Sequence, residues 1–413
     1  MNLESIYLII IIGAGYALLF WALSLKIPAL PLILIFGLAP FQNDMSGGGG
    51  LHFSLSEVHL LLSAPLLVLR GWRGSLSWMS GMLWGALVLA ALITIPNWRE
   101  TSAVSLIQMG LYWIGAVAVF STIPQRKGDW EIALRALVVV GVLLAAVALS
   151  AKSNYIWGLH KNGVGASLAC ALVVTVECWT VAVGRSRLMY LAALAIISGG
   201  LVVGLSRGAW LSAFVGVGFL LAWRGQYRRM AQLGALLVPL VLLIWMLLPQ
   251  DSKDYALSFD PERHNIKARR LNTEWVQEQW AGSPLWGVGV GLRKEYDATN
   301  VLWLTLAETG PFWVVALLGM HMRLIHGLWT QRTLFVKGTN SVSSVALAGG
   351  LVLGKLAHGL VDHYWSRGAL MIAWAMVGMA LSPTSISSQF SGPSFIFSKR
   401  KLINLKINQK IKT

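Results

Sequence analysis

Residues 188–223 read LMYLAALAIISGGLVVGLSRGAWLSAFVGVGFLLAW, a stretch that is apolar throughout except at its centre. It divides into two segments, 188–204 and 208–223, around the polar residues Ser206 and Arg207. Each segment approaches the roughly 17 to 25 residues that a helix needs to cross a bilayer. An arginine in mid-membrane costs about 2.5 to 3.5 kcal/mol. We therefore expect a break between two spanning helices, with Arg207 at a membrane boundary.

The composition of the whole chain agrees with this reading. Of 413 residues, 56% are hydrophobic and only 12% are charged, and the mean hydropathy is +0.65. Soluble domains carry about 25% charged residues, so the sequence predicts an integral membrane protein. The net charge of +16 favours membrane lipid as a partner rather than nucleic acid, because most basic residues lie in short loops and in the tail.

Apolar runs recur along almost the whole chain, and they predict an all-α polytopic protein with eleven to thirteen transmembrane helices. The expected spans are 5–24, 27–41, 57–70, 76–95, 102–120, 132–150, 163–183, 188–204, 208–223, 230–248, 300–321, 342–361 and 368–382. Residues 1–382 then form one transmembrane domain, and residues 383–413 form a basic cytoplasmic tail.

Basic residues gather in every second loop between these spans. They are Lys26, Arg70, Arg73, Arg126, Lys127, Arg185, Arg187, Arg224, Arg228, Arg229, Arg323, Arg332 and Lys337. Because cytoplasmic loops carry most of the lysine and arginine of a membrane protein, this set is expected to face the cytoplasm. The alternate loops are poor in cations, except for the long polar segment 249–299, which we expect on the external side.

Cations in that external segment call for a physical reason. It contains Arg263, Arg269 and Arg270, and the simplest explanation is an anionic ligand at the outer membrane face. Interleaved tryptophan and arginine is also typical of any membrane-interface segment.

Two further polar groups lie at predicted external helix ends. Either Asn162 caps the span that follows it, or Lys161, Asn162 and the helix amino end form an anion-binding wall. Near the end of a later span, His358, Asp362 and His363 suggest either an ion-paired or hydrogen-bonded helix end or part of a metal site. No further well-placed carboxylate or histidine is visible to complete such a site, and the two cysteines, Cys170 and Cys178, have no metal-site spacing. We expect no metal and no cofactor.

Three motifs together resemble the O-antigen ligase and O-antigen polymerase superfamily of bacterial membrane glycosyltransferases. They are Ser-Arg-Gly-Ala at 206–209, the stretch 270–291 with its Pro-Leu-x-Gly-Val-Gly-x-Gly, and Leu-Ala-Glu-Thr-Gly at 306–310. The resemblance covers about residues 50–382. It implies a GT-C-like fold with one large periplasmic loop. It also implies transfer of a glycan from undecaprenyl diphosphate to a hydroxyl of a glycan, lipid or protein acceptor. That reaction takes place at the periplasmic face of the inner membrane, without a metal or a nucleotide sugar.

The resemblance also implies residue roles. Arg207 and Arg270 would hold the diphosphate, with Arg269 or Arg263 as alternatives to Arg270. Ligases of this family carry a histidine just before the asparagine that opens the span ending in Glu-x-Gly, whereas this chain has Asp297-Ala-Thr-Asn300 there.

Asp297, the nearest carboxylate, is then the candidate base, and the missing histidine favours a polymerase or a ligase for another surface polysaccharide. The expected substrate-binding residues are Lys161, Asn162, Arg263, Arg269, Asn300, Glu308 and Asp362. The alternative is a transporter or flippase of an anionic glycolipid or metabolite, which predicts paired broken helices or inverted halves. The sequence offers only the break at Arg207.

Overall fold

The computed structural model describes residues 3–41, 53–70, 78–151, 155–156, 159–257, 264–294, 299–330, 342–362, 364–365 and 367–382. The predicted tail, 383–413, lies outside these ranges. Within them the regular structure is helical, apart from one antiparallel pair in which Tyr155 lies opposite His160. The predicted all-helical fold is therefore confirmed for the described part of the chain.

The helices follow the predicted spans closely. The first half contains α1 (Leu3–Lys26), α2 (Ala29–Leu38), α3 (Leu55–Leu62), α4 (Ala64–Leu69), α5 (Trp78–Thr94), η1 (Ile95–Asn97), α6 (Glu100–Gly110), η2 (Leu111–Gly115), α7 (Ala116–Thr122) and α8 (Lys127–Ala151). The second half contains β1 (Tyr155–Ile156), β2 (Leu159–His160), α9 (Lys161–Val181), α10 (Gly184–Val203), α11 (Arg207–Trp223), α12 (Tyr227–Leu247), α13 (Gln250–Leu257), α14 (His264–Gly282), η3 (Leu292–Lys294), α15 (Val301–Thr330), α17 (Ser344–Gly359) and α18 (Arg367–Leu381).

Three elements differ from their predicted form. The span predicted at 57–70 is split at Ser63 into α3 and α4. The long polar segment contains two helices, α13 and α14. The span predicted at 300–321 extends to Thr330 and bends at Gly310, whose φ of 73° lies outside the helical range. Pro311 follows directly, and proline removes a helix hydrogen bond, so the bend has a local cause.

Six of the described helical segments are long and apolar enough to cross a membrane, and seven shorter apolar helices accompany them. The structure is thus that of a helical polytopic membrane protein. Within the apolar window of α9, 94% of the residues are buried, whereas for α12 the figure is 6%. Helix α9 therefore belongs to the centre of the bundle, and α12 presents its apolar surface outward.

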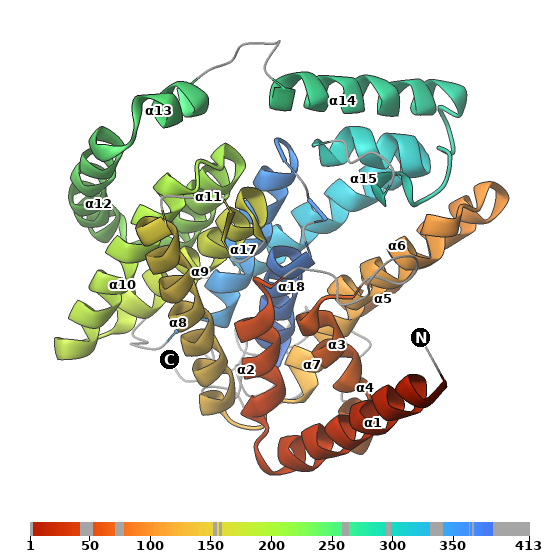
Figure 1. Cartoon of the computed structure of the whole chain (residues 1–413), viewed down its shortest axis with the longest axis horizontal. Coiled ribbons are helices and arrows are strands. Elements are labelled where there is room, and N and C mark those ends of the chain that lie inside the picture. The colour runs from red at the N-terminus through yellow and green to blue at the C-terminus, as the bar shows by residue number, and fades with distance from the viewer. Residues whose placement is uncertain are drawn as a thin grey trace, which may run out of the picture.

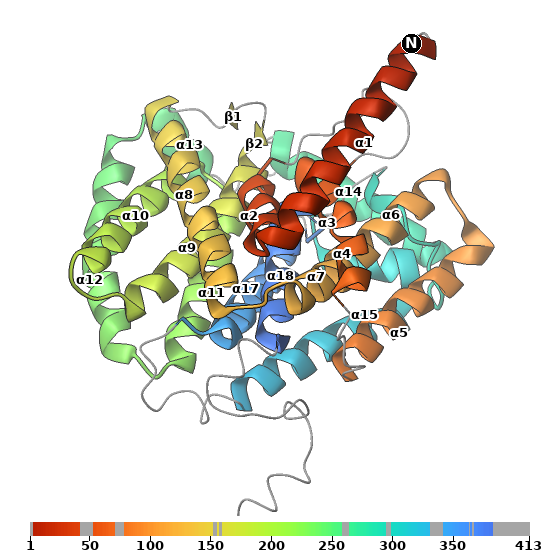
Figure 2. The ribbon, with the colours of Figure 1, turned by 90° about the horizontal axis from the view of Figure 1, so that it is seen from below.

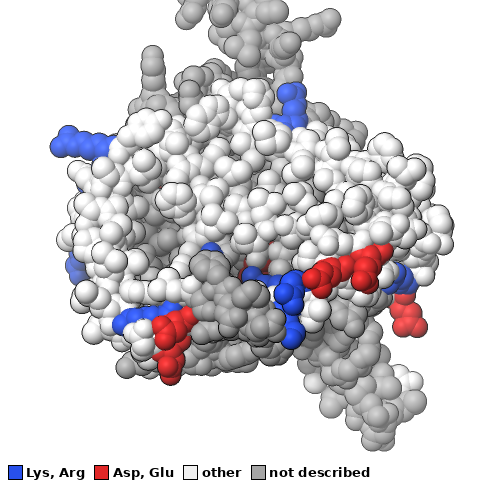
Figure 3. Space-filling model, turned by 90° about the horizontal axis from the view of Figure 1, so that it is seen from above, with Lys and Arg blue, Asp and Glu red and all other residues white. Residues whose placement is uncertain are grey.

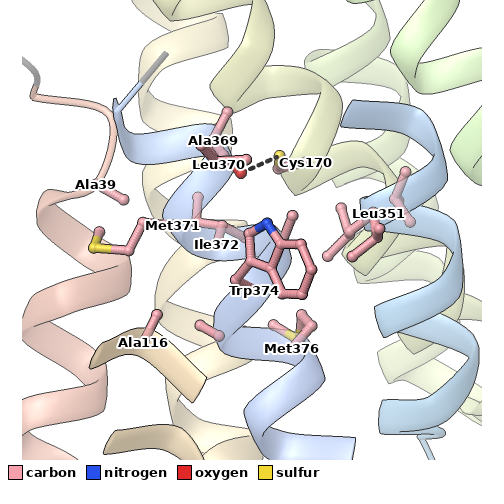
Figure 4. Packing of buried hydrophobic residues seen from close by; sticks show 14 of the residues in the cluster. Ala39, Ala116, Cys170, Leu351, Ala369, Leu370, Met371, Ile372, Trp374 and Met376 are labelled. Carbon is pink, nitrogen blue, oxygen red and sulfur yellow. Dashed lines mark hydrogen bonds between the residues drawn. The ribbon is translucent and has the colours of Figure 1, made fainter. Parts of the chain in front are cut away.

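The centre of the bundle is built from α9, α17 and α18, with α11, α15, α2 and α7 around them (Figure 1). Trp374 of α18 is fully buried, with Cys170 of α9 above its ring and Leu351 of α17 beside it (Figure 4). Helices α11 and α17 approach closely because Gly216 faces Gly350: a Cβ on Gly350 would lie 2.8 Å from the Gly216 carbonyl oxygen. Small residues allow such contacts between membrane helices.

Loops of the same predicted side meet in space. On the predicted external side, Thr101 Oγ1 donates to Gly291 O (3.2 Å) and Asn300 Nδ2 donates to Leu360 O (3.0 Å). Among the basic loops, Arg224 Nε donates to Glu177 Oε2 (2.7 Å), and Glu177 also accepts from the Ser343 amide. Elements β1, β2 and α13 lie at one end of the bundle (Figure 2). Charged side chains gather over α13 and α14 along one rim, and a broad uncharged surface adjoins them (Figure 3).

Candidate functional site

Asp362, just beyond the carboxyl end of α17, is the centre of a polar cluster. It is 1% exposed. Its Oδ1 accepts a hydrogen bond from Asn162 Nδ2 (3.3 Å), and its Oδ2 lies 3.3 Å from Arg269 Nη2 and 3.8 Å from His358 Nε2. These contacts come from α9, α14 and α17, so a buried carboxylate joins three separate helices. A buried charge is tolerated only when it is paired and hydrogen-bonded in this way.

The cluster continues along one face of α17 into the bundle. Lys355 is 2% exposed, and its Nζ lies 3.3 Å from His358 Nδ1. Lys355, His358 and Asp362 are three and four residues apart, the spacing that places side chains on one helix face. The Tyr364 hydroxyl also lies in this region and hydrogen-bonds to His321 Nε2 at 2.8 Å.

The Ser-Arg-Gly motif is located directly against this cluster. Leu205 adopts a left-handed backbone, with φ of 50°, between α10 and α11, and Arg207 is the first residue of α11. The predicted break at this position is thus confirmed. A Cβ on Gly208 would lie 2.6 Å from His358 Cδ2 and 3.0 Å from Asp362 Cβ. Glycine is required there because the start of α11 abuts the His358 and Asp362 side chains.

The predicted arginines differ in their surroundings. Arg207 is exposed at the amino end of α11, one residue from the Gly208 contact. Arg269 contacts Asp362 and also donates to the Val361 carbonyl oxygen (3.0 Å), with 37% of its side chain exposed. Arg270 is half-exposed and pairs with Glu274 of its own helix at 3.6 Å. Arg269 therefore contacts the cluster directly.

Two predicted binding residues support the same region from its edges. Asn300 caps α15, since its Oδ1 accepts from the amides of Leu302 (2.9 Å) and Trp303 (3.3 Å), and its Nδ2 donates to the Leu360 carbonyl oxygen. Lys161 hydrogen-bonds to the Tyr255 hydroxyl, and its Nζ lies 4.0 Å from the centre of that ring. Lys161 thereby fastens the start of α9 to α13.

Glu308 holds the glycine-rich turn that contains Gly287, Gly289 and Gly291. Its Oε1 accepts from the Gly291 amide (2.8 Å), and Gly289 N donates to the Glu308 carbonyl oxygen (2.9 Å). Gly287 and Gly289 have φ of 71° and 89°, values that favour glycine. The side chain of Glu308 thus shapes this turn.

Two predicted site residues, Arg263 and Asp297, lie outside the described residues. Among the described residues, no three or more His, Cys, Asp or Glu side chains gather in a way that would hold a metal ion. The cationic groups Arg269 and Lys355 in the cluster, with Arg207 next to Gly208, instead suit a ligand with negative charge.

The sequence reading missed two contributors to this region. Lys355 is a charged residue inside an apolar span, which is a signal of function in membrane proteins. Arg293 is buried, stacks 4.4 Å from the Trp365 ring and donates to Ser105 O (2.7 Å). Nothing in the local sequence distinguishes Arg293 from the other cations of the polar segment.

No protein-family model matches this chain, and no curated protein sequence is significantly similar to it. The fold and the cluster together define a helical polytopic membrane protein with an arginine-bearing polar site at one end of its bundle.

Proposed function

We propose that this protein is a glycosyltransferase that moves a glycan from undecaprenyl diphosphate to an acceptor hydroxyl, as a surface-polysaccharide polymerase or O-antigen-type ligase. The observation that carries the proposal is the convergence of separate motifs on Asp362. Arg269 binds it, Gly208 of the Ser-Arg-Gly motif abuts it, and Asn162 donates to it. Interfacial arginines are common in membrane proteins, but that pattern alone does not bring such distant segments together around one buried carboxylate.

The chemistry matches these groups. The acceptor oxygen forms a bond to the anomeric carbon while the bond from that carbon to the diphosphate oxygen breaks. The diphosphate leaves with the electron pair, and the hydroxyl proton passes to a base. Preorganised arginines stabilise such developing charge far better in a low-dielectric site than in water. Arg207 and Arg269 are the groups we assign to the diphosphate.

The choice of Arg269 over Arg270 rests on their partners. The guanidinium of Arg269 is held by Asp362 and by the Val361 carbonyl oxygen, while part of its side chain stays accessible. Arg270 is directed to Glu274 at the outside of α14. When protein groups hold one edge of a guanidinium, its remaining N–H groups can donate to a phosphate in a fixed orientation.

Asp362 is proposed as a positioning residue rather than as the base. It already contacts Arg269, His358 and Asn162, so its oxygens are engaged. Asp297 remains the candidate base from the sequence. The protein then resides in the bacterial inner membrane with a GT-C-like architecture, and this end of the bundle faces the periplasm.

One observation favours the second candidate, a transporter or flippase of an anionic glycolipid. Lys355 and His358 extend a line of titratable side chains from Asp362 into the bundle. Ionisable residues inside a membrane protein often mark transport routes. Transport would require this line to open toward the opposite end, where Glu177 binds Arg224.

The test compares two adjacent arginines. Purified wild type, Arg269→Ala and Arg270→Ala are titrated with a fluorescent polyprenyl diphosphate, and each variant is also expressed in a strain lacking the gene. Loss of charge-assisted hydrogen bonds worth about 1.5 to 3 kcal/mol weakens binding at least roughly tenfold in Arg269→Ala. Arg270→Ala is expected to bind within about threefold of wild type.

In the same cells, Arg269→Ala is expected to accumulate lipid-linked glycan at a normal protein level. Normal binding and normal polymer in Arg269→Ala would remove Arg269 from the site. If wild-type protein fails to bind the polyprenyl diphosphate, the glycosyltransferase proposal itself is rejected. Movement of labelled glycolipid across proteoliposomes without transfer would favour transport.

A further inference from the structure

An apolar groove lies between α8 and α10, and none of its lining residues belongs to the cluster around Asp362. It has a volume of about 840 Å³, and α9 contributes part of its wall. The floor consists of buried side chains such as Leu134, Val138 and Ala193, whereas Val139 and Met189 at the rims are exposed. Helices α8 and α10 lie next to each other on the outer side of the bundle (Figures 1 and 2).

Helices α8 and α10 are in contact along one part of their length and are separated by the groove along another part. A Cβ on Gly200 would lie 2.6 Å from Ala145 Cα, so α8 and α10 are in direct backbone contact there. The groove begins just below this contact, at Leu143 and Ile196, and extends to Glu131. It is therefore closed at its inner end.

The length of the groove corresponds to one leaflet. From Glu131 to Leu143 the helix rises about 18 Å, at 1.5 Å per residue. Half of the hydrocarbon core of a bilayer is about 15 Å. A single acyl chain of one leaflet can thus lie along the groove with its head group at the Glu131 end.

Polar groups line only that end. They are Glu131 and Arg135 of α8 and Ser186 and Tyr190 of α10. Arg135 is exposed, and it lies near Tyr190 across the groove. These residues lie at the helix ends adjoining the basic loops, opposite to the end that carries Asp362.

We propose that this groove binds a phospholipid of the adjacent leaflet, with an acyl chain between α8 and α10 and its phosphate at Arg135. A head group that combines a phosphate with free hydroxyls fits best, because Arg135 can donate to the phosphate while Glu131 accepts from a hydroxyl. Phosphatidylglycerol has this chemistry. The site is separate from the one at Asp362, since the acyl chain enters from the opposite side of the bilayer.

The test uses phosphatidylglycerol with a photoreactive group in its acyl chain, incorporated into nanodiscs with the full-length protein. Labelled positions are mapped by mass spectrometry. We expect labels on α8 and α10 at groove residues such as Val138 and Ile196, and about fivefold less labelling there by the phosphatidylcholine analogue. A basic residue near the membrane surface contributes about 1 kcal/mol toward an anionic lipid, which corresponds to that factor.

Variants distinguish lipid binding in the groove from nonspecific contact with the surrounding bilayer. Arg135→Ala is expected to lower groove labelling by phosphatidylglycerol about fivefold, and Ala193→Phe, which fills the floor, is expected to abolish it. Arg323→Ala removes an exposed arginine outside the groove and should leave labelling unchanged. Equal labelling of Leu242 and Met246 on α12, or labelling insensitive to Arg135→Ala, would overturn the proposal. Arg135 is exposed, so this outcome is decisive even if Ala193→Phe fails to fold.

Discussion

Asn162 Nδ2 donates a hydrogen bond to Asp362 Oδ1 at 3.3 Å, and so joins two residues that are 200 positions apart in the chain. The bond connects the amino end of α9, the most buried of the candidate spanning helices, to the carboxyl end of α17. Because Arg269 and His358 reach the other oxygen of the same carboxylate, Asp362 links three helices at one end of the bundle.

Replacing Asp362 by alanine is expected to lower the free energy of unfolding by about 2 to 3 kcal/mol, since buried partners lose their acceptor and counter-charge. Asp362→Asn retains an acceptor for Asn162 and should cost about half as much. Thermal unfolding of the detergent-solubilised variants measures both. Equal stability of Asp362→Ala and wild type would show that the cluster does not hold the helices together.

Gly208→Ala is expected to destabilise the protein by about 1 to 3 kcal/mol, because the added Cβ would lie 2.6 Å from the buried His358 ring. The matched control is Gly218→Ala on the same helix, where nothing lies within 4 Å of a new Cβ. The control should be neutral or slightly stabilising, because alanine favours helix. A difference of less than about 0.5 kcal/mol between the two variants would contradict the close contact of α11 with α17.

Glu308→Ala is expected to loosen the glycine-rich turn. The carboxylate accepts from the amides of Gly291 (2.8 Å) and Arg293 (3.4 Å), and buried amides without an acceptor cost about 1 to 3 kcal/mol. Hydrogen exchange of the peptide covering 284–294 should accelerate, while exchange in α9 stays unchanged. Glu308→Gln, which keeps an acceptor, should show a smaller effect. Unchanged exchange in Glu308→Ala would show that the turn is held by its backbone bonds alone.

Glu177→Ala, at the opposite end of the bundle, is expected to cost about 3 to 5 kcal/mol. Glu177 is fully buried and binds Arg224, and it also accepts from the Ser343 amide. A double-mutant cycle with Arg224→Leu measures the coupling of the pair by chemical or thermal unfolding. Additive losses in the double variant would show that the two charges act independently.

Much of the fold could be read from local sequence. The apolar segments 188–204 and 208–223 correspond to α10 and α11, and the break between them is found at Leu205, just before Arg207. Apolar length and helix-breaking glycines are properties of short segments, so they need no knowledge of distant residues. The split of 57–70 at Ser63 and the extension of α15 to Thr330 were missed, because they depend on how these helices pack.

The site was only partly readable. Sequence pointed to Asn162, Arg269 and Asp362 individually, but it did not show that Arg269 contacts Asp362, and it left Lys355 out. Adjacent residues on a helix point about 100° apart, so which arginine meets Asp362 depends on the rotation of α14 relative to α17. That rotation is set by packing between segments far apart in the chain.

The sequence by itself therefore determined that this is a helical membrane protein, where most of its spanning helices lie, and which loops share an end. These properties follow from hydrophobic length and charge bias, which act locally and against the bilayer. Only the tertiary structure decided the partners of Asp362, the role of Glu308 in the glycine-rich turn and the groove between α8 and α10. A hydrogen bond requires two atoms within about 3 Å, and only the packed arrangement of all the helices sets distances that small.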